Sequence, residues 1–171
     1  PPLRKPRLMF PDDIQTLARQ VVETARSRGL MVTAAESCTG GLVSAALTSV
    51  AGSSAVVERG FVTYSNAAKS ELLGVPAPLI ARHGAVSEAV ARAMAEGAPR
   101  HSAAQVSVAV TGVAGPGGGS ADKPVGLVHC AAAGPGCLIH VERRFGDIAR
   151  DEVRLESVRV ALGLLLDRIG A

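Results

Sequence analysis

The chain has 171 residues, of which 47% are hydrophobic and 19% are charged. This length suits a single domain, and the composition supplies a large apolar core, which excludes a wholly disordered chain. Basic residues exceed acidic ones by only 18 to 15, and aromatic residues make up just 2%. Because a nucleic-acid groove needs a stronger basic stripe and stacking aromatics, we expect no direct nucleic-acid binding.

The cysteines and histidines show no arrangement typical of a disulfide framework or a metal site. Cys38, Cys130 and Cys137 are odd in number, and neither they nor the four histidines have ligand spacing. This pattern predicts a reduced, cytoplasmic protein without a metal or a cofactor. No apolar run reaches the roughly 18 residues that a membrane span needs, so we expect no membrane association.

The first half of the chain alternates between helical and extended patterns. Residues 1–11 are Pro-rich and are expected to form an N-terminal extension, with a single domain over 12–171. Apolar residues recur at three and four from Ile14 to Ala25, which predicts a helix ending near Gly29. A strand over 30–36, a helix over 41–52 and a β-rich segment over 55–65 follow. The next helix, over 66–74, is expected to have Asn66 as its N-cap and to stop at Gly74.

The second half begins with a helix and ends with one. We expect a helix over 88–98 capped by Ser87, a strand over 104–112 and a glycine-rich segment over 112–124. Strands over 125–133 and 138–145 flank a Gly-Pro-Gly turn, and the last helix covers about 150–169. This order predicts one three-layer α/β/α domain with a mixed central sheet.

Ser37 stands at the junction of a strand and a helix, in "AAESCTGGLVSAAL" (34–47). Ligands of α/β sheets bind at such strand ends, where the amides of the following helix favour an anion or an oxyanion. Gly40 and Gly41 would let a substrate approach the backbone. From spacing alone, however, Ser37 or Thr39 is more simply a helix cap. Cys38 is a rival nucleophile, but a cysteine in such a turn is more typical of a small buried residue.

Tyr64 and Lys69 lie five residues apart in "YSNAAKS" (64–70), across a predicted strand-to-helix transition. Both side chains could face one pocket there. A lysine activates a serine only when it is neutral, which requires burial or cationic neighbours. By spacing alone, Lys69 is more simply a solvated helix residue and Tyr64 a half-buried strand residue.

The segment "TGVAGPGGG" (111–119) puts five glycines directly after a strand. Such a loop can cradle a phosphate through its backbone amides. It matches neither the P-loop pattern nor the dinucleotide fingerprint, and a plain surface loop is an equally good interpretation.

Together these stretches resemble a known family. "AAESCTGGLVSAALTSVAGSSAVVERGFVTYSNAAKSELLGV", "HGAVSEAVARAMAEGA" and "VTGVAGPGGGSADKPVGLV" are similar, in the same order, to the C-terminal domain of the CinA competence/damage-inducible proteins. The resemblance covers about residues 12–168. Longer members carry a preceding molybdopterin-binding-like domain, and we expect no part of it in this sequence. The stand-alone members imply an amidohydrolase that converts nicotinamide mononucleotide to nicotinic acid mononucleotide and ammonia, in pyridine nucleotide salvage.

The resemblance also implies the roles of particular residues. Ser37 matches the family's nucleophile, and Tyr64 and Lys69 match its other catalytic positions. The family's Gly-Asp-Arg stretch reads "GDIARDEVR" here, with Ile148 at the arginine, so Arg150 or Arg154 is expected to replace it. Lys123 is either a further phosphate contact or a surface residue. The positions expected to bind substrate are Thr39, Gly40, Gly41, Asn66, Thr111, Gly112, Gly115, Gly117, Gly118, Arg150 and Arg154.

Two classes of function remain open at this point. One is the amidohydrolase, a homodimer or larger homo-oligomer acting on a small nucleotide. The other is a non-catalytic module that senses a nucleotide or binds a partner in a competence or DNA-damage response. Formation of ammonia distinguishes the two.

Overall fold

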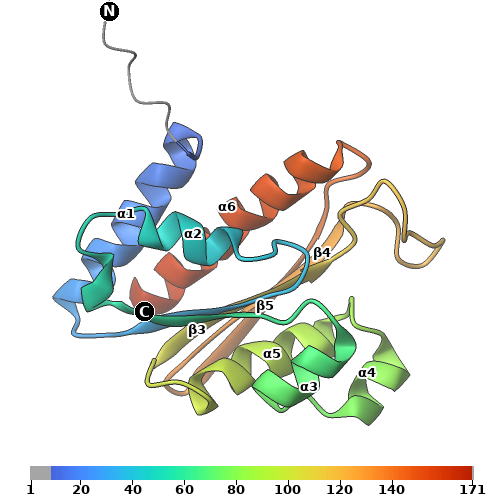
Figure 1. The fold of residues 1–171 in the computed structure, drawn as a ribbon, viewed down its shortest axis with the longest axis horizontal. Coiled ribbons are helices and arrows are strands. Elements are labelled where there is room, and N and C mark those ends of the chain that lie inside the picture. The colour runs from blue at the N-terminus through green and yellow to red at the C-terminus, as the bar shows by residue number, and fades with distance from the viewer. Residues whose placement is uncertain (1–8, 171) are drawn as a thin grey trace, which may run out of the picture.

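The computed structural model describes residues 9–170. Six helices, a short 3-10 turn and five strands follow one another along this part of the chain (Figure 1). In order they are α1 Asp12–Ser27, β1 Val32–Glu36, α2 Leu42–Thr48, η1 Ser53–Ala55, β2 Val57–Val62, α3 Asn66–Leu73, α4 Ala77–His83, α5 Glu88–Arg100, β3 Val106–Gly112, β4 Leu127–Gly134, β5 Cys137–Arg144 and α6 Arg150–Gly170.

The five strands form one mixed sheet in the order β2-β1-β3-β4-β5. Strands β2, β1 and β3 run parallel to one another, while β4 and β5 form an antiparallel hairpin beside β3. Parallel neighbours require crossover connections, which α2 supplies between β1 and β2, and α3 to α5 supply between β2 and β3. The carboxyl ends of β1, β2 and β3 therefore meet at one edge of the sheet.

Helices cover both faces of the sheet, as the alternation of elements predicts. In Figure 1, α1, α2 and α6 lie on one face, and α3, α4 and α5 lie on the other. Two buried apolar clusters fill the spaces between the layers, and Val, Ala and Leu supply most of their side chains. The three-layer α/β/α prediction is confirmed.

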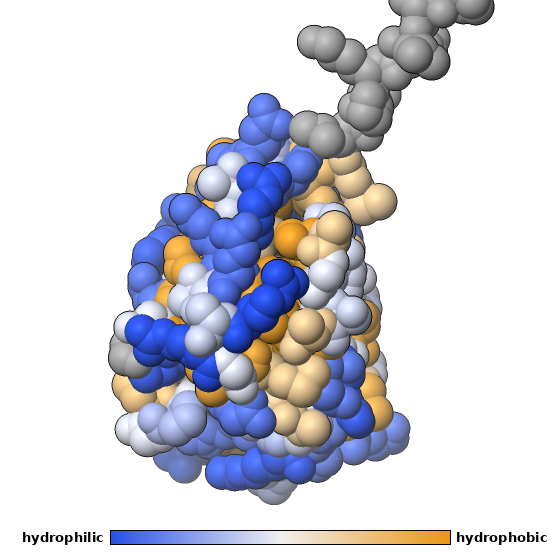
Figure 2. Space-filling view, turned by 90° about the vertical axis from the view of Figure 1, so that its left-hand side faces the viewer, coloured by the Kyte–Doolittle hydropathy of each residue, from blue (hydrophilic) through white to orange (hydrophobic). Residues whose placement is uncertain are grey.

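Residues near the N-terminus belong to the packed domain. Phe10, which the expected boundary assigns to the extension, is only 4% exposed, and its carbonyl accepts a hydrogen bond from the Gln15 side chain. Residues 1–8 of the expected extension lie outside the described residues. Figure 2 views the molecule from the edge where the parallel strands begin, and hydrophilic residues are interspersed with hydrophobic ones on that face. Within residues 9–170, no helix combines the length and the apolar character needed to cross a bilayer.

Several element boundaries differ from the prediction. The helix expected over 41–52 ends at Thr48, and a turn and η1 follow it. The N-cap of α3 is Ser65, whose hydroxyl accepts a hydrogen bond from the Ala68 amide, so the assignment of the cap to Asn66 is wrong. Ser87 caps α5 as predicted, by accepting a bond from Val90. Helix α4 was not predicted.

Candidate active site

Ser37 is the first residue after β1, and the sheet holds it in place. Its amide donates to the carbonyl of Val110 in β3 over 2.9 Å. On the other side, the amide of Thr63, just after β2, donates to the Glu36 carbonyl over 2.8 Å. The hydrogen-bond ladders therefore continue one residue beyond the strands. This continuation fixes Ser37 and the segment at Thr63 side by side.

Lys69 reaches this edge from α3. Its side chain is turned inward, and the residue is 1% exposed. The amine nitrogen Nζ lies 2.9 Å from Ser37 Oγ, 2.8 Å from the Thr63 carbonyl oxygen and 3.3 Å from the Tyr64 carbonyl oxygen. Three oxygen atoms, none of them from a carboxylate, thus surround the amine.

Burial of the amine favours the neutral form of Lys69. Burial lowers the pKa of Lys69, while Cys38 would raise that pKa only as a thiolate. Carbonyl oxygens can only accept, so the two N–H bonds of a neutral amine satisfy Thr63 and Tyr64. Nζ donates to Ser37 Oγ in the structure, and in the neutral form its lone pair would instead accept the Ser37 hydroxyl proton. Among the ion pairs of residues 9–170, none involves Lys69. Ser37 and Lys69 therefore lie at the distance and in the burial that a nucleophile and a neutral base would need.

Cys38 does not have the properties of a nucleophile. It is 6% exposed, and burial raises the pKa of its thiol to about 12. At neutral pH the sulfur is protonated, and the thiolate is the reactive form. The expectation that Cys38 is a small buried residue agrees with this environment, although the residue also borders the cavity described below.

Glu36 determines the conformation of the turn that follows Ser37. Its buried carboxylate accepts hydrogen bonds from the Val43 amide at 2.7 Å, the Ser44 amide at 3.1 Å and the Ser44 hydroxyl at 2.9 Å. The first amides of α2 are thereby occupied by a carboxylate. The alternative in which Ser37 or Thr39 caps this helix is therefore wrong.

Gly40 and Gly41 serve this turn. Both adopt a positive φ, 58° and 106°, which a side chain would strain. The Gly40 amide donates to the Ser37 carbonyl, so it is engaged within the turn. The two glycines shape the chain behind Ser37, and neither borders the cavity in front of it.

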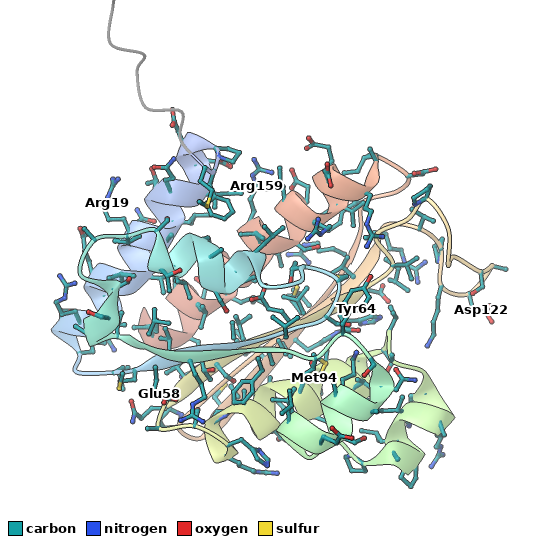
Figure 3. The ribbon with its side chains drawn as sticks, in the orientation of Figure 1. Arg19, Glu58, Tyr64, Met94, Asp122 and Arg159 are labelled. Atoms are coloured by element: carbon teal, nitrogen blue, oxygen red, sulfur yellow. The ribbon has the colours of Figure 1, made fainter. Side chains whose placement is uncertain are left out.

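Tyr64 and Arg150 meet at the mouth of the site. The Tyr64 side chain lies at the edge between the two helical layers (Figure 3), and the residue is 62% exposed. Arg150, the first residue of α6, donates one hydrogen bond to the Tyr64 hydroxyl at 3.1 Å and another to the Gly115 carbonyl at 2.8 Å. The Tyr64 backbone carbonyl, by contrast, accepts from Lys69.

A cavity of about 290 Å³ opens in front of the Ser37–Lys69 pair. One wall comes from the end of β3 and the glycine-rich segment, and the other from the loop between α4 and α5. Its lining residues are Ser37, Cys38, Tyr64, Lys69, Ala85, Val86, Thr111, Gly112, Val113, Ala114, Gly115, Gly117, Gly118 and Arg150.

Comparison with known proteins places the chain in a family. The family model described as the CinA C-terminal domain matches residues 14–169. The chain belongs to this family. A CinA-like protein from Synechococcus sp. (strain RCC307) is 55% identical over 157 residues, and the match covers 91% of this chain and 38% of that protein. One from Anaeromyxobacter dehalogenans (strain 2CP-C) is 52% identical over 158 residues, covering 92% of this chain and 38% of that protein.

The chain therefore spans 38% of the length of these CinA-like relatives. Solved structures of similar length also match. The competence/damage inducible protein CihA from Agrobacterium tumefaciens is 54% identical, with a TM-score of 0.94 and coverage of 96% of this chain and 100% of that chain. A competence-damaged protein (CinA) superfamily protein from Escherichia coli is 35% identical, with a TM-score of 0.86 and coverage of 95% and 94%.

Some of the expected substrate-binding residues of this CinA domain lie away from the cavity. Asn66 borders a separate hollow between α3 and α4. Thr39 is fully buried, and its carbonyl accepts from Arg154 at 3.3 Å. Arg154 also donates to the Cys38 carbonyl at 3.2 Å, so it supports the turn from behind. Of the two arginines expected to replace the family's arginine, Arg150 is the one that lines the cavity.

The sequence interpretation missed the apolar part of the cavity wall. Ala85, Val86, Val113 and Ala114 line it. The Thr111 hydroxyl donates to the Ala85 carbonyl at 2.8 Å and so holds the α4–α5 loop against the end of β3. Small apolar residues carry no chemical signature of their own. The available signal was that "HGAVSEAV" (83–90) is among the stretches that resemble the CinA family.

Proposed function

We propose that this CinA domain is an amidohydrolase that converts nicotinamide mononucleotide and water to nicotinic acid mononucleotide and ammonia. The observation that carries the proposal is the buried contact of 2.9 Å between Lys69 Nζ and Ser37 Oγ. Burying a lysine costs stability, because burial disfavours its charged form, and groups perturbed in this way are typical of functional sites.

The first step would form an acyl-enzyme. Ser37 Oγ attacks the carboxamide carbon, while the lone pair of Lys69 takes the hydroxyl proton. The carbonyl π electrons move to oxygen, giving a tetrahedral intermediate. Lys69 then returns its proton to the leaving nitrogen. The C–N bond breaks, ammonia departs, and a nicotinoyl ester remains on Ser37.

The second step would hydrolyse this ester. Lys69, neutral again, takes a proton from water as the water oxygen attacks the ester carbon. Collapse of the intermediate breaks the bond to Ser37 Oγ, and the proton returns to that oxygen. The product carboxylate leaves. One water is consumed and one ammonia is released, so the atoms balance.

The remaining groups of the cavity suit the rest of the substrate. Small apolar side chains, among them Val86 and Val113, would contact the pyridine ring, and the Arg150 guanidinium would attract the phosphate. For the developing oxyanion we propose the Cys38 amide, since Gly40 is engaged within the turn. The Tyr64 hydroxyl, held by Arg150, would assist there or in proton transfer.

Ammonia release tests the proposal. Ser37→Ala and Lys69→Ala should each reduce kcat by roughly 10³-fold or more, as in other covalent hydrolases. Lys69→Arg should be equally inactive, because a guanidinium stays protonated and cannot act as the base. Turnover near the wild-type rate in Ser37→Ala or Lys69→Ala would refute the assignment.

The same experiment addresses the non-catalytic alternative. Wild-type protein that binds nicotinamide mononucleotide saturably, without releasing ammonia, would favour a sensing module. A panel of other pyridine amides, assayed alongside, would identify the preferred substrate.

A further inference from the structure

Lys123 forms a hydrogen bond that has no part in the proposed reaction. It lies in the segment between β3 and β4, and its Nζ donates a hydrogen bond to the carbonyl of His83, the last residue of α4. The next residue, Gly84, has a φ of +76°, and a Cβ built there would lie 2.5 Å from Lys123 Nζ. Gly84 thus leaves room for the ammonium group.

The segment that carries Lys123 is internally braced. The Ser120 amide donates to the Lys123 carbonyl at 2.9 Å, and the Lys123 amide donates to Ser120 Oγ at 3.1 Å. A Cβ at Gly115 would lie 2.5 Å from Val125 Cγ1, so the start and the end of the segment are in close contact. Figure 3 shows Asp122, the neighbour of Lys123, at the tip of this segment. The bond made by Lys123 therefore acts on a segment that is braced at 120–123 and closed between Gly115 and Val125.

The two partners of this bond belong to opposite walls of the cavity. Gly115, Gly117 and Gly118 line it on the side of Lys123. Ala85 and Val86, which immediately follow Gly84, line it on the other side. Lys123 itself is not among the lining residues. Its bond to His83 instead joins the walls at a point away from the reacting groups.

We propose that Lys123 is a positioning residue that fixes the separation of the two cavity walls and thereby sets substrate affinity. This inference about Lys123 depends on the proposed amidohydrolase function only where KM and kcat are measured. Without the bond, the glycine-rich segment has to be ordered when substrate binds, and that cost reduces affinity. Ser37 and Lys69 stay in place because β1, α3 and the Thr63 carbonyl hold them through contacts that do not involve Lys123. The effect should therefore appear in KM rather than in kcat.

Two variants break the contact from opposite sides. Lys123→Met removes the ammonium group and keeps the length of the side chain. Gly84→Ala keeps the positive charge on Lys123, but the added methyl group pushes the ammonium group away from the His83 carbonyl. Each should raise KM roughly tenfold and leave kcat within about twofold. The double variant should be no worse than either single one, because both remove the same bond. Lys123→Arg, which can still donate, should restore part of the affinity.

The control for Gly84→Ala is Gly136→Ala. Gly136 lies in the β4–β5 turn with a nearly equal φ of +74°, and its Cβ would meet nothing within 4 Å. Gly136→Ala places an alanine at a similar positive φ away from Lys123, so it should leave KM unchanged. If Lys123 instead contacts the substrate directly, Lys123→Met will raise KM and Gly84→Ala will not, which would overturn the proposal. An unchanged KM in both variants would overturn it as well.

Hydrogen exchange without substrate separates this proposal from the proposed function. Lys123→Met and Gly84→Ala should speed amide exchange in 115–124 and 84–87, while exchange in β1 and β3 stays at the wild-type rate. Exchange unchanged in Lys123→Met would refute the proposal, whether or not the protein releases ammonia. Lys123→Met and Lys123→Arg suffice for this test if Gly84→Ala does not fold.

Discussion

Among the site residues, Lys69 is the one whose environment is predicted least well from the neighbouring sequence. In a short helix such as α3, a lysine usually extends into solvent, and the spacing by itself favours that interpretation. In the structure the side chain turns under the segment at Thr63 and is 1% exposed. Packing of β1 beside β2 creates that space, and no local window of sequence contains this information. The spacing left a pocket-facing Lys69 open, and the family resemblance was what favoured it as a catalytic position.

The three cysteines give a prediction at this scale. Cys38 and Cys130 are buried, and burial raises the pKa of both thiols, whereas Cys137 is exposed. Native protein treated with iodoacetamide near pH 8 should therefore be alkylated at Cys137 alone. Peptide mass spectrometry locates the label, Cys137→Ser serves as the control, and all three should react after unfolding. Alkylation of Cys38 as fast as Cys137 would restore it as a rival nucleophile.

At the scale of elements, most of the secondary structure follows from apolar periodicity and turn residues. Helix α4 is the exception, because its seven residues follow a proline and include one buried apolar side chain, Ile80. The cap of helix α2 is a second feature that local sequence patterns do not predict. The sequence offered Ser37 and Thr39 as caps, whereas the buried Glu36 carboxylate performs that role from inside a strand. A carboxylate that acts seven positions ahead matches no capping pattern.

A histidine pair joins β4, β5 and α5. His129 Nδ1 and His140 Nε2 lie 2.9 Å apart and share one hydrogen bond. Burial lowers the pKa of both from their ordinary value of 6.5, and a charged His140 ring lowers the pKa of His129 further. As the pH falls towards and below 6.5, the unfolded chain binds more protons than the folded one. The free energy of unfolding therefore decreases with decreasing pH. The charged side chains around the pair are Glu88 and Arg92 of α5, Glu142 of β5 and Lys123.

Stability between about pH 7.5 and about pH 5.5 should therefore decrease, by at most about 1.4 kcal/mol per pH unit for each histidine. Urea unfolding at several pH values measures this slope. The double variant His129→Gln/His140→Gln should show a smaller slope. The lowered pKa of Lys69 adds to the slope in the same direction in both proteins, so the test is the difference between the wild type and the double variant. Asp13, Glu58 and Glu88 do not contribute, because the pKa of each carboxyl is lowered from a value already below this range. An equal slope in the double variant would contradict the account.

At the scale of the whole molecule, the sheet brings together groups that are distant in sequence. Ser37 and Lys69 are 32 positions apart, and Arg150 reaches Tyr64 across 86. The sequence predicts that strand ends carry the site, because parallel strands terminate at a common edge. It does not predict the distances, the protonation state or the apolar wall, since these depend on the packing of side chains from five segments.

The central claim is that Lys69 is neutral beside Ser37, and a titration tests it directly. The chain has only three lysines, Lys5, Lys69 and Lys123, so labelling with [13Cε]lysine gives a spectrum of three signals. Lys69→Met and Lys123→Met assign them. We predict that the Lys69 signal titrates below the ordinary lysine pKa of 10.5, because burial disfavours the charged amine, and that the amine is uncharged at the pH of turnover. A Lys69 signal that titrates at or above that value would show a charged lysine, and the proposed base would not exist.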